Sequence, residues 1–158
     1  MPASPSLSAE ELLQVGFQYA YALTHHHHDA EDLVQTAWLK LYQRYGAVTT
    51  KALFFTTIRN LYIDQYRRRQ RVQFTALTSE HAHFPAAGDT AREDTEVTLD
   101  QMLAQLRDIE REALFLHVVE GYSANEIATL TSKPRGTVLS LIHRGRQKLA
   151  ALAAAETR

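Results

Sequence analysis

The chain has 158 residues and a mass of 17.9 kDa, which suffices for one compact domain or two small ones but not for a large catalytic barrel. Hydrophobic residues make up 45% and charged residues 22%, so global disorder, a collagen and a coiled-coil rod are disfavoured. The absence of cysteine excludes disulfide scaffolds, thiolate metal sites and cysteine nucleophiles. No leader pattern opens the chain and no apolar run reaches the ~18 residues of a membrane helix, so we expect a cytoplasmic protein without membrane insertion.

The net charge of −1 hides an uneven distribution along the chain. Residues 1–72 carry a net +2, residues 73–110 a net −6 and residues 111–158 a net +3. Two mildly basic blocks therefore flank an acidic middle, and each end is able to meet a polyanion that the middle repels or mimics.

Apolar residues recur at helical spacing in the first half of the chain, and strand patterns are almost absent, so we expect an all-α fold. A capping box at Ser8 is expected to start a helix that ends near residue 24. Asp29 is expected to cap a second helix, which stops at Gly46, and a third is expected over about 50–70. These three helices are predicted to form one small domain.

The segment 72–94 loses the helical period and gathers Thr, Ser, Ala, Gly, Pro and acidic residues, so we expect a flexible linker and a domain boundary there. A helix is expected near 95–105, and Asp108 is expected to cap the next one, which runs through Val119.

The end of the chain has the outline of a helix-turn-helix. A second capping box at Ser123 predicts a short helix, and Pro134 stands where a first-turn proline is tolerated, opening a last helix to about residue 153. The face of that helix opposite its apolar stripe is polar and partly cationic, as base and phosphate contacts require. Helical spacing alone leaves an ordinary solvated face as the alternative.

Three separated motifs carry a resemblance to a known family. They are DAEDLVQ at 29–35, RNLYID at 59–64 leading into arginines at 67–69, and GYSANEIA at 121–128 with PRGTV at 134–138. Together and in this order they resemble the extracytoplasmic-function (ECF) group of bacterial sigma-70 factors. The resemblance implies a non-enzymatic initiation factor with a region 2 domain over 1–71, a linker over 72–94 and a region 4 helix-turn-helix domain over 95–158.

The resemblance also implies partners and site residues. The partners are core RNA polymerase, through its β′ clamp and β flap, promoter DNA and an anti-sigma factor; no cofactor and no metal are implied. The implied polymerase-binding residues are Asp29, Asp32, Gln35 and Lys40. The implied contacts to the opened −10 element are Phe55, Thr56, Arg59, Asn60, Asp64, Arg67, Arg68 and Arg71. The implied contacts to the −35 duplex are Arg135, Thr137, Leu139, Ser140, His143, Arg144 and Arg146.

Physical chemistry supports the two DNA assignments, because planar groups stack on unpaired bases and arginines neutralise phosphates. The chain also departs from the family pattern. Leu53 stands where tryptophan is frequent, and Ser132 and Lys133 replace the glycine and small apolar residue of the turn. Leu139 and Leu141 replace basic residues of the last helix; Leu141 borders the core stripe, whereas Leu139 is expected to meet solvent or a thymine methyl.

Two other readings remain open at this stage. A helix-turn-helix regulator would bind duplex DNA through its C-terminal domain alone, and a sigma-mimicking adaptor would keep polymerase-like surfaces without directing initiation. We expect no enzyme, because the chain lacks phosphate-cradling, HExxH and GxSxG motifs. We expect the histidine run at 25–28 to form a polar loop and not a metal site.

Overall fold

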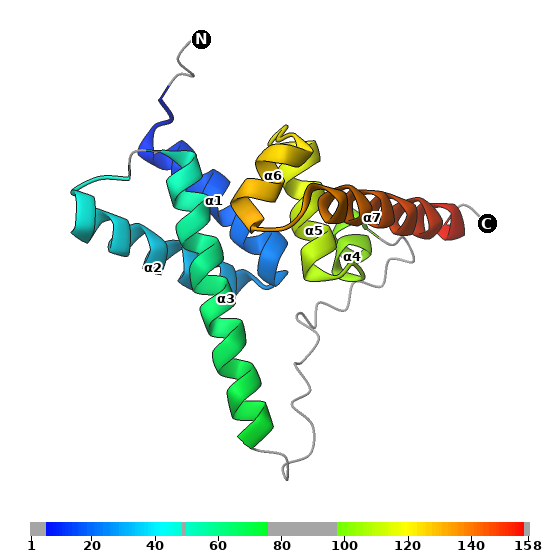
Figure 1. The fold of residues 1–158 in the computed structure, drawn as a ribbon, viewed down its shortest axis with the longest axis horizontal. Helices are drawn as coiled ribbons and strands as arrows, with labels where there is room; N and C mark the ends of the chain where they lie inside the picture. The colour runs from blue at the N-terminus through cyan, green and yellow to red at the C-terminus, as the bar shows by residue number, and fades with distance from the viewer. Residues whose placement is uncertain (1–5, 49, 76–97, 157–158) are drawn as a thin grey trace.

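The computed structural model describes residues 6–48, 50–75 and 98–156, in which every regular element is helical (Figure 1). The elements are α1 (Ala9–Thr24), α2 (His27–Tyr45), α3 (Lys51–Thr75), α4 (Leu99–Ala104), α5 (Asp108–Leu114), η1 (Phe115–Val119), α6 (Ala124–Thr131) and α7 (Arg135–Glu156). The predicted all-α fold of two small helical units is confirmed. None of these helices is both long and apolar enough to cross a bilayer.

Helices α1, α2 and α3 pack against one another and form the N-terminal unit. Its core holds Tyr19, Leu33, Phe54, Phe55 and Ile58, whose side chains are fully buried.

Local hydrogen bonds explain where the first helices start and stop. Ser8 and Glu11 form the predicted capping box, and Gly46 ends α2 in the left-handed region at φ 75°. The predicted cap at Asp29 is wrong: His26 is the N-cap, and its Nδ1 accepts a hydrogen bond from the Asp29 N–H at 3.3 Å. An imidazole nitrogen replaces the expected carboxylate, so α2 begins three residues earlier.

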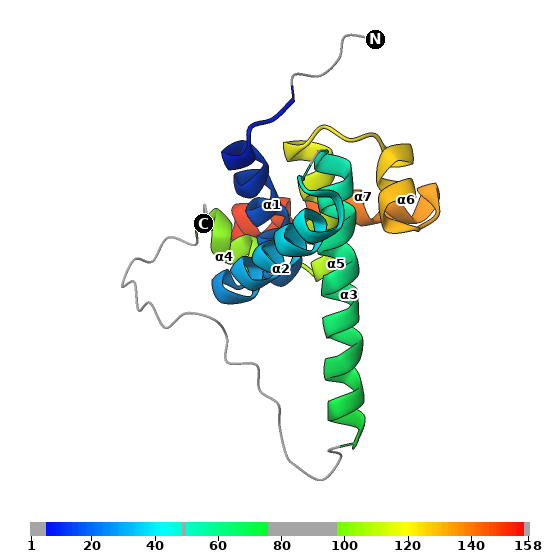
Figure 2. The same ribbon diagram turned by 90° about the vertical axis from the view of Figure 1, so that its left-hand side faces the viewer.

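Helix α3 is longer than its sequence pattern suggests. It continues to Thr75, past the predicted end near residue 70, so the first positions of the predicted 72–94 linker are helical. The C-terminal half of α3 projects away from the rest of the molecule in two perpendicular views (Figures 1 and 2). The rest of the predicted linker falls largely in 76–97, outside the described residues.

The C-terminal unit comprises α4 to α7, with α5 packed between α1 and α7. Asp108 is the first helical residue of α5 and not its predicted cap; Arg107 is the N-cap, and its N–H donates to Glu110 Oε1 at 3.0 Å. The predicted α-helix through Val119 is also wrong in its last turn, which is π-helical. There the Glu120 N–H donates to the Phe115 carbonyl at 3.1 Å. A π turn carries an extra residue, which shifts the helical register, and Val118 is 61% exposed.

Helices α6 and α7 form the predicted helix-turn-helix. Ser123 and Glu126 make the predicted capping box of α6. Ser132 ends α6 at φ 55°, a left-handed conformation that explains why the family pattern has glycine at this position.

We expect Ser132→Gly to raise the free energy of unfolding by about 0.5–1 kcal/mol, because glycine adopts the left-handed region without steric cost. Urea denaturation followed by circular dichroism measures the change. Ser123→Ala is the matched change of opposite sign, because it removes the cap of the same helix and costs about 1 kcal/mol. Equal stability of all three proteins would contradict the assigned cap geometry.

Candidate nucleic-acid interface

The outer face of α7 is polar and fully accessible. Its buried face is formed by Val138, Leu141, Ile142 and Gly145. All seven predicted −35 residues are exposed: Arg135, Thr137, Leu139, Ser140, His143, Arg144 and Arg146. As expected, Leu141 belongs to the core, whereas Leu139 is 43% exposed and lies off the buried face. The helix thus presents hydrogen-bonding and cationic groups together with one apolar side chain on a single surface.

The predicted −10 residues divide into an exposed and a covered set. The exposed set lies along α3 toward its projecting end and consists of Asn60, Asp64, Arg67, Arg68 and Arg71. Thr56 is half-buried, and its hydroxyl donates to the Ala52 carbonyl at 2.9 Å. A row of cations along a projecting helix suits a nucleic-acid backbone.

Phe55 and Arg59 make up the covered set. Phe55 is fully buried and stacks on Tyr19 with ring centroids 4.6 Å apart. The Arg59 Nε donates to Glu112 Oε2 of α5 at 3.0 Å, and only 11% of the Arg59 side chain is exposed. In this arrangement both side chains are engaged inside the protein, and their contact with the −10 element stays a prediction.

The predicted polymerase-binding residues lie on α2. Asp32, Gln35 and Lys40 are exposed, whereas Asp29 is half-buried and lies 3.6 Å from Arg69 Nη2 of α3. The structure therefore places Asp32 and Gln35 near the centre of the outer face and Asp29 at its edge.

The sequence prediction missed two residues of the same face. Leu39 is 57% and Tyr42 is 56% exposed, and both continue the helical row that starts at Asp32 and Gln35. Their spacing of three and four residues from Gln35 and from each other was a usable signal. The outer face of α2 combines polar and apolar groups, as protein interfaces do.

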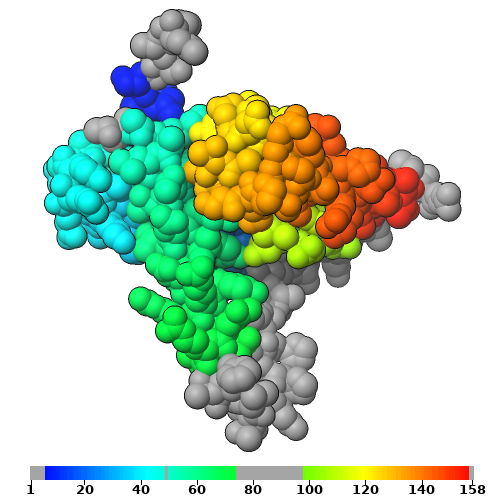
Figure 3. Space-filling model, in the orientation of Figure 1, coloured from blue at the N-terminus to red at the C-terminus, as the bar shows by residue number. Residues whose placement is uncertain are grey.

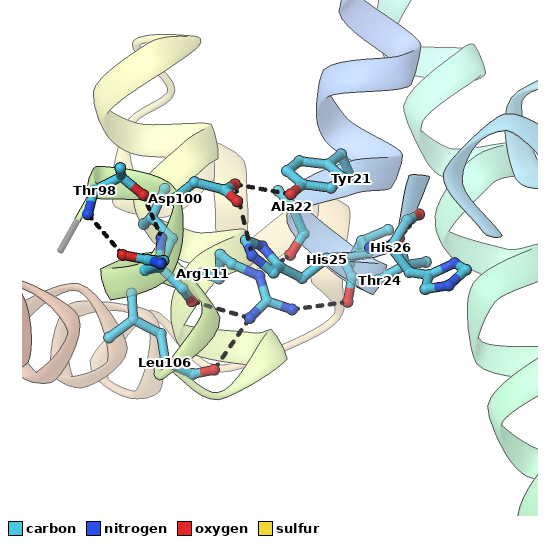
Figure 4. A network of polar contacts seen from close by, with 12 residues as sticks. Tyr21, Ala22, Thr24, His25, His26, Thr98, Asp100, Leu106 and Arg111 are labelled. Atoms are coloured by element: carbon cyan, nitrogen blue, oxygen red, sulfur yellow. Dashed lines mark hydrogen bonds and ion pairs between the residues drawn. The ribbon is translucent and has the colours of Figure 1, made fainter. Parts of the chain in front are cut away.

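The two units meet in a buried polar network around Arg111 (Figure 4). Arg111 donates to the carbonyls of Ala22 at 2.6 Å and Leu23 at 3.3 Å, in the last turn of α1, and to the carbonyl of Leu106 at 3.1 Å. The residues of that last turn, all within the described chain, include no basic side chain, so the C-terminal unit supplies the cation that the helix end favours. Burial lowers the pKa of Arg111.

Glu112, the next residue, joins both units from the other side of α5. Its Oε2 accepts from the Tyr19 hydroxyl at 2.6 Å and from Arg59 Nε at 3.0 Å. Burial and the Glu112 charge raise the pKa of Tyr19 well above its usual value. The carboxylate therefore has both a neutral and a charged donor, as a buried anion requires.

The histidine run lies at this junction and is not the expected loop, because α2 already begins at His27. His25 is the C-cap of α1 at φ 49°, its ring stacks near Tyr21 and its Nε2 lies 3.6 Å from Asp100 Oδ1. Its Nδ1 is buried without a hydrogen-bond partner among the described residues. In the described segments, no three His, Asp or Glu residues are grouped so that they could hold a metal ion.

We expect acid to weaken the protein through His25. Burial and the Arg111 charge lower its pKa below the usual 6.5, and these effects outweigh the opposing effect of Asp100. A lowered folded-state pKa stabilises the neutral form, so this contribution is complete above pH ~6.5 and is lost as pH falls through the folded-state value. His25→Asn, which tolerates positive φ, should lose less stability than wild type between pH 7.5 and 5 in urea titrations, whereas exposed His28→Asn should follow wild type.

Comparisons with known proteins match both units. The family model for sigma-70 region 2 matches residues 10–72, and that for sigma-70 region 4 matches residues 96–149. The chain is 31% identical to the ECF RNA polymerase sigma factor EcfG of Rhodopseudomonas palustris, over 96% of this chain and 87% of that protein. The chain belongs to the ECF group of the sigma-70 family.

Further matches agree with this family. The chain is 32% identical to the ECF sigma factor SigE of Mycolicibacterium smegmatis over 84% of this chain, but spans only 55% of that relative's length. The sigma factor RpoE of Bartonella quintana, solved in complex with the anti-sigma factor NepR, superimposes with a TM-score of 0.67 at 28% identity, covering 90% of this chain and 92% of that chain. Sigma-70 factors are non-enzymatic and direct transcription initiation at promoters. The region 2 match is not expected for a regulator whose N-terminal helices only dimerise.

Proposed function

We propose that this sigma factor binds core RNA polymerase and directs initiation by holding the opened −10 element on α3 and reading the −35 duplex with α7. The observation that carries the proposal is a pair of exposed surfaces that contain cations, one on α3 in the N-terminal unit and one on α7 in the C-terminal unit. Each helix buries its apolar side in its own unit and presents cations outward.

We assign core binding to the outer face of α2, with Asp32, Gln35, Leu39 and Tyr42 at its centre. The exposed apolar pair would supply contact area, and the flanking polar residues would fix the orientation of the partner. On this assignment the face meets the β′ clamp, while the C-terminal unit meets the β flap. An anti-sigma factor is a further expected partner, in line with the complex of the similar Bartonella protein.

We further propose that the protein acts in the cytoplasm, without catalysis and without a cofactor, and that its two domains are joined by a linker that begins after the end of α3 at Thr75. Because Arg59 is held by Glu112 of α5, its proposed contact with the −10 element requires the two units to separate, whereas Phe55 is buried in the core of the N-terminal unit itself.

In vitro transcription with bacterial core polymerase and a promoter library tests the proposal. The purified protein should join core polymerase in the absence of DNA and should initiate from a restricted set of promoters. Leu39→Asp on α2 should weaken core binding, whereas Leu139→Ala on α7 should leave core binding unchanged.

Failure to join core polymerase, under conditions where another sigma factor joins it, would refute the proposal. Core binding without initiation at any promoter would instead favour the sigma-mimicking adaptor.

A further inference from the structure

The contact between the two units depends on one short stretch of α5. Arg111 is 7% exposed and Glu112 is 2% exposed, and both have partners in the N-terminal unit. Within the described residues, both groups that hydrogen-bond the Glu112 carboxylate come from α1 and α3. Loss of these contacts would leave Glu112 without the partners seen here, so its burial belongs to the closed arrangement.

Three polar bridges surround this central pair. Tyr62 donates to Asp108 Oδ2 at 2.6 Å, and Tyr21 donates to Asp100 Oδ1 at 2.7 Å. On the far side, Lys51 Nζ lies 2.6 Å from Glu120 Oε2. The bridges fix the relative placement of the units.

Such an interface is well suited to open again. Buried ions lose hydration when the units close and regain it when they part, so their attraction is largely offset by desolvation. Polar interfaces between domains of one chain behave like transient protein interfaces. The contact therefore selects one arrangement of the two units and can still open.

The closed arrangement conflicts with simultaneous use of both DNA surfaces. The side chains of Arg59 and Tyr62 on α3 line the same pocket as Lys133. Lys133 lies in the turn between α6 and α7. Figure 3 shows α3 beside α6 and α7 on this face. DNA segments on successive turns of a duplex are about 34 Å apart. Two such segments, one on α3 and one on α7, therefore cannot both be bound while α3 and the start of α7 meet at this pocket.

We propose that Arg111 and Glu112, with their partners on α1 and α3, form an intramolecular latch that keeps the free protein closed and covers the Arg59 part of its −10 surface. The latch withholds Arg59, which pairs with Glu112, and brings the Tyr122 ring within 6.4 Å of the Phe55 ring, which Tyr19 of the same unit also covers. This inference rests on the proposed function, because the covered residues matter only if α3 contacts the promoter.

A distance measurement tests the latch without polymerase. The chain has no native cysteine, so Gln14→Cys on α1 and Ala150→Cys on α7, both at exposed positions, accept spin labels selectively. Double electron–electron resonance on the full-length free protein should show a single distance between the two labels, that of the closed arrangement.

Glu112→Ala removes the carboxylate and leaves buried Arg59 unpaired, so the ratio of open to closed molecules should rise at least about tenfold. Glu10→Ala, an exposed acid in the first turn of α1, is the matched control and should leave the distance of the closed arrangement unchanged. Apparent affinity for core polymerase should rise with the open fraction, because only open molecules bind.

A second variant locks the latch and does not depend on weakening the fold. Lys51→Cys and Glu120→Cys, joined by a reducible bis-methanethiosulfonate linker, should initiate at least about tenfold less than the same protein after reductant. The latch would be overturned by a label-to-label distance in the wild type longer than that of the closed arrangement. It would also be overturned by equal distances in wild type and Glu112→Ala, or by full activity of the locked protein. If no form binds polymerase while the distances shift as expected, the proposed function fails and the latch as a conformational device stands.

Discussion

Gly16→Ala is expected to be severely destabilising. A Cβ atom at this position would lie 2.2 Å from Cε1 and 2.8 Å from Cζ of Phe54. The Phe54 ring is fully buried and packs edge-on against Trp38 at 5.7 Å, so it cannot swing aside without displacing other core side chains. We expect a loss of about 3 kcal/mol in the free energy of unfolding. Urea denaturation followed by circular dichroism measures it.

Two other helical glycines provide graded controls. At Gly145 the new Cβ would meet Leu114 Cδ1 at 2.7 Å, the end of a flexible side chain, so Gly145→Ala should cost less. At Gly136 it would meet no described atom within 4 Å, so Gly136→Ala should be neutral or stabilising by up to about 1 kcal/mol. An equal effect of all three changes would contradict the assigned packing of α1 on α3.

We expect substitutions on α3 to weaken promoter binding without changing base preference. Arg67 and Arg68 are exposed on the projecting part of the helix and are proposed to neutralise phosphates. Alanine at either position should lower the magnitude of the salt slope by about 1 per lost contact, equally for all promoter sequences. Binding titrations over a range of salt concentrations measure the slope.

Substitutions on α7 should instead change base preference. Removal of a good bidentate contact by alanine at Arg135, His143 or Arg144 should cost about 1–3 kcal/mol of discrimination at one position of the −35 element. Leu139→Ala should reduce discrimination at a thymine while the salt slope and core binding stay unchanged. Identical base preferences for the wild type and all α7 variants in a promoter-variant selection would rule out readout by this face.

The sequence by itself determined the helices and most of their ends. Ser8 and Ser123 each start a helix with a carboxylate three residues on, and these bonds are local, so spacing alone reveals them. Gly46 adopts the positive φ that ends α2. The apolar period also separated buried Leu141 from exposed Leu139 on α7, because the direction of a side chain follows directly from its place in the helical repeat.

Helical spacing could not predict the contacts of residues whose partners lie far along the chain. Periodicity predicts that a face is buried but not against which surface. The cap of α2 by His26 depends on an imidazole orientation, and the π turn that exposes Val118 has no simple spacing signal. The sequence analysis did not single out the exposed pair Leu39 and Tyr42, because helical spacing does not say which apolar side chains stay outside their own domain.

Only the tertiary structure decided the role of Glu112 and its neighbours. Glu112 pairs with Tyr19, 93 residues away, and with Arg59, 53 residues away. Charged residues are normally predicted on the surface, because burying an ion costs several kcal/mol unless donors meet it. Those donors lie in the other unit, so the sequence predicts a DNA contact for Arg59 and the packing of α5 on α1 and α3 shows it paired inside the protein.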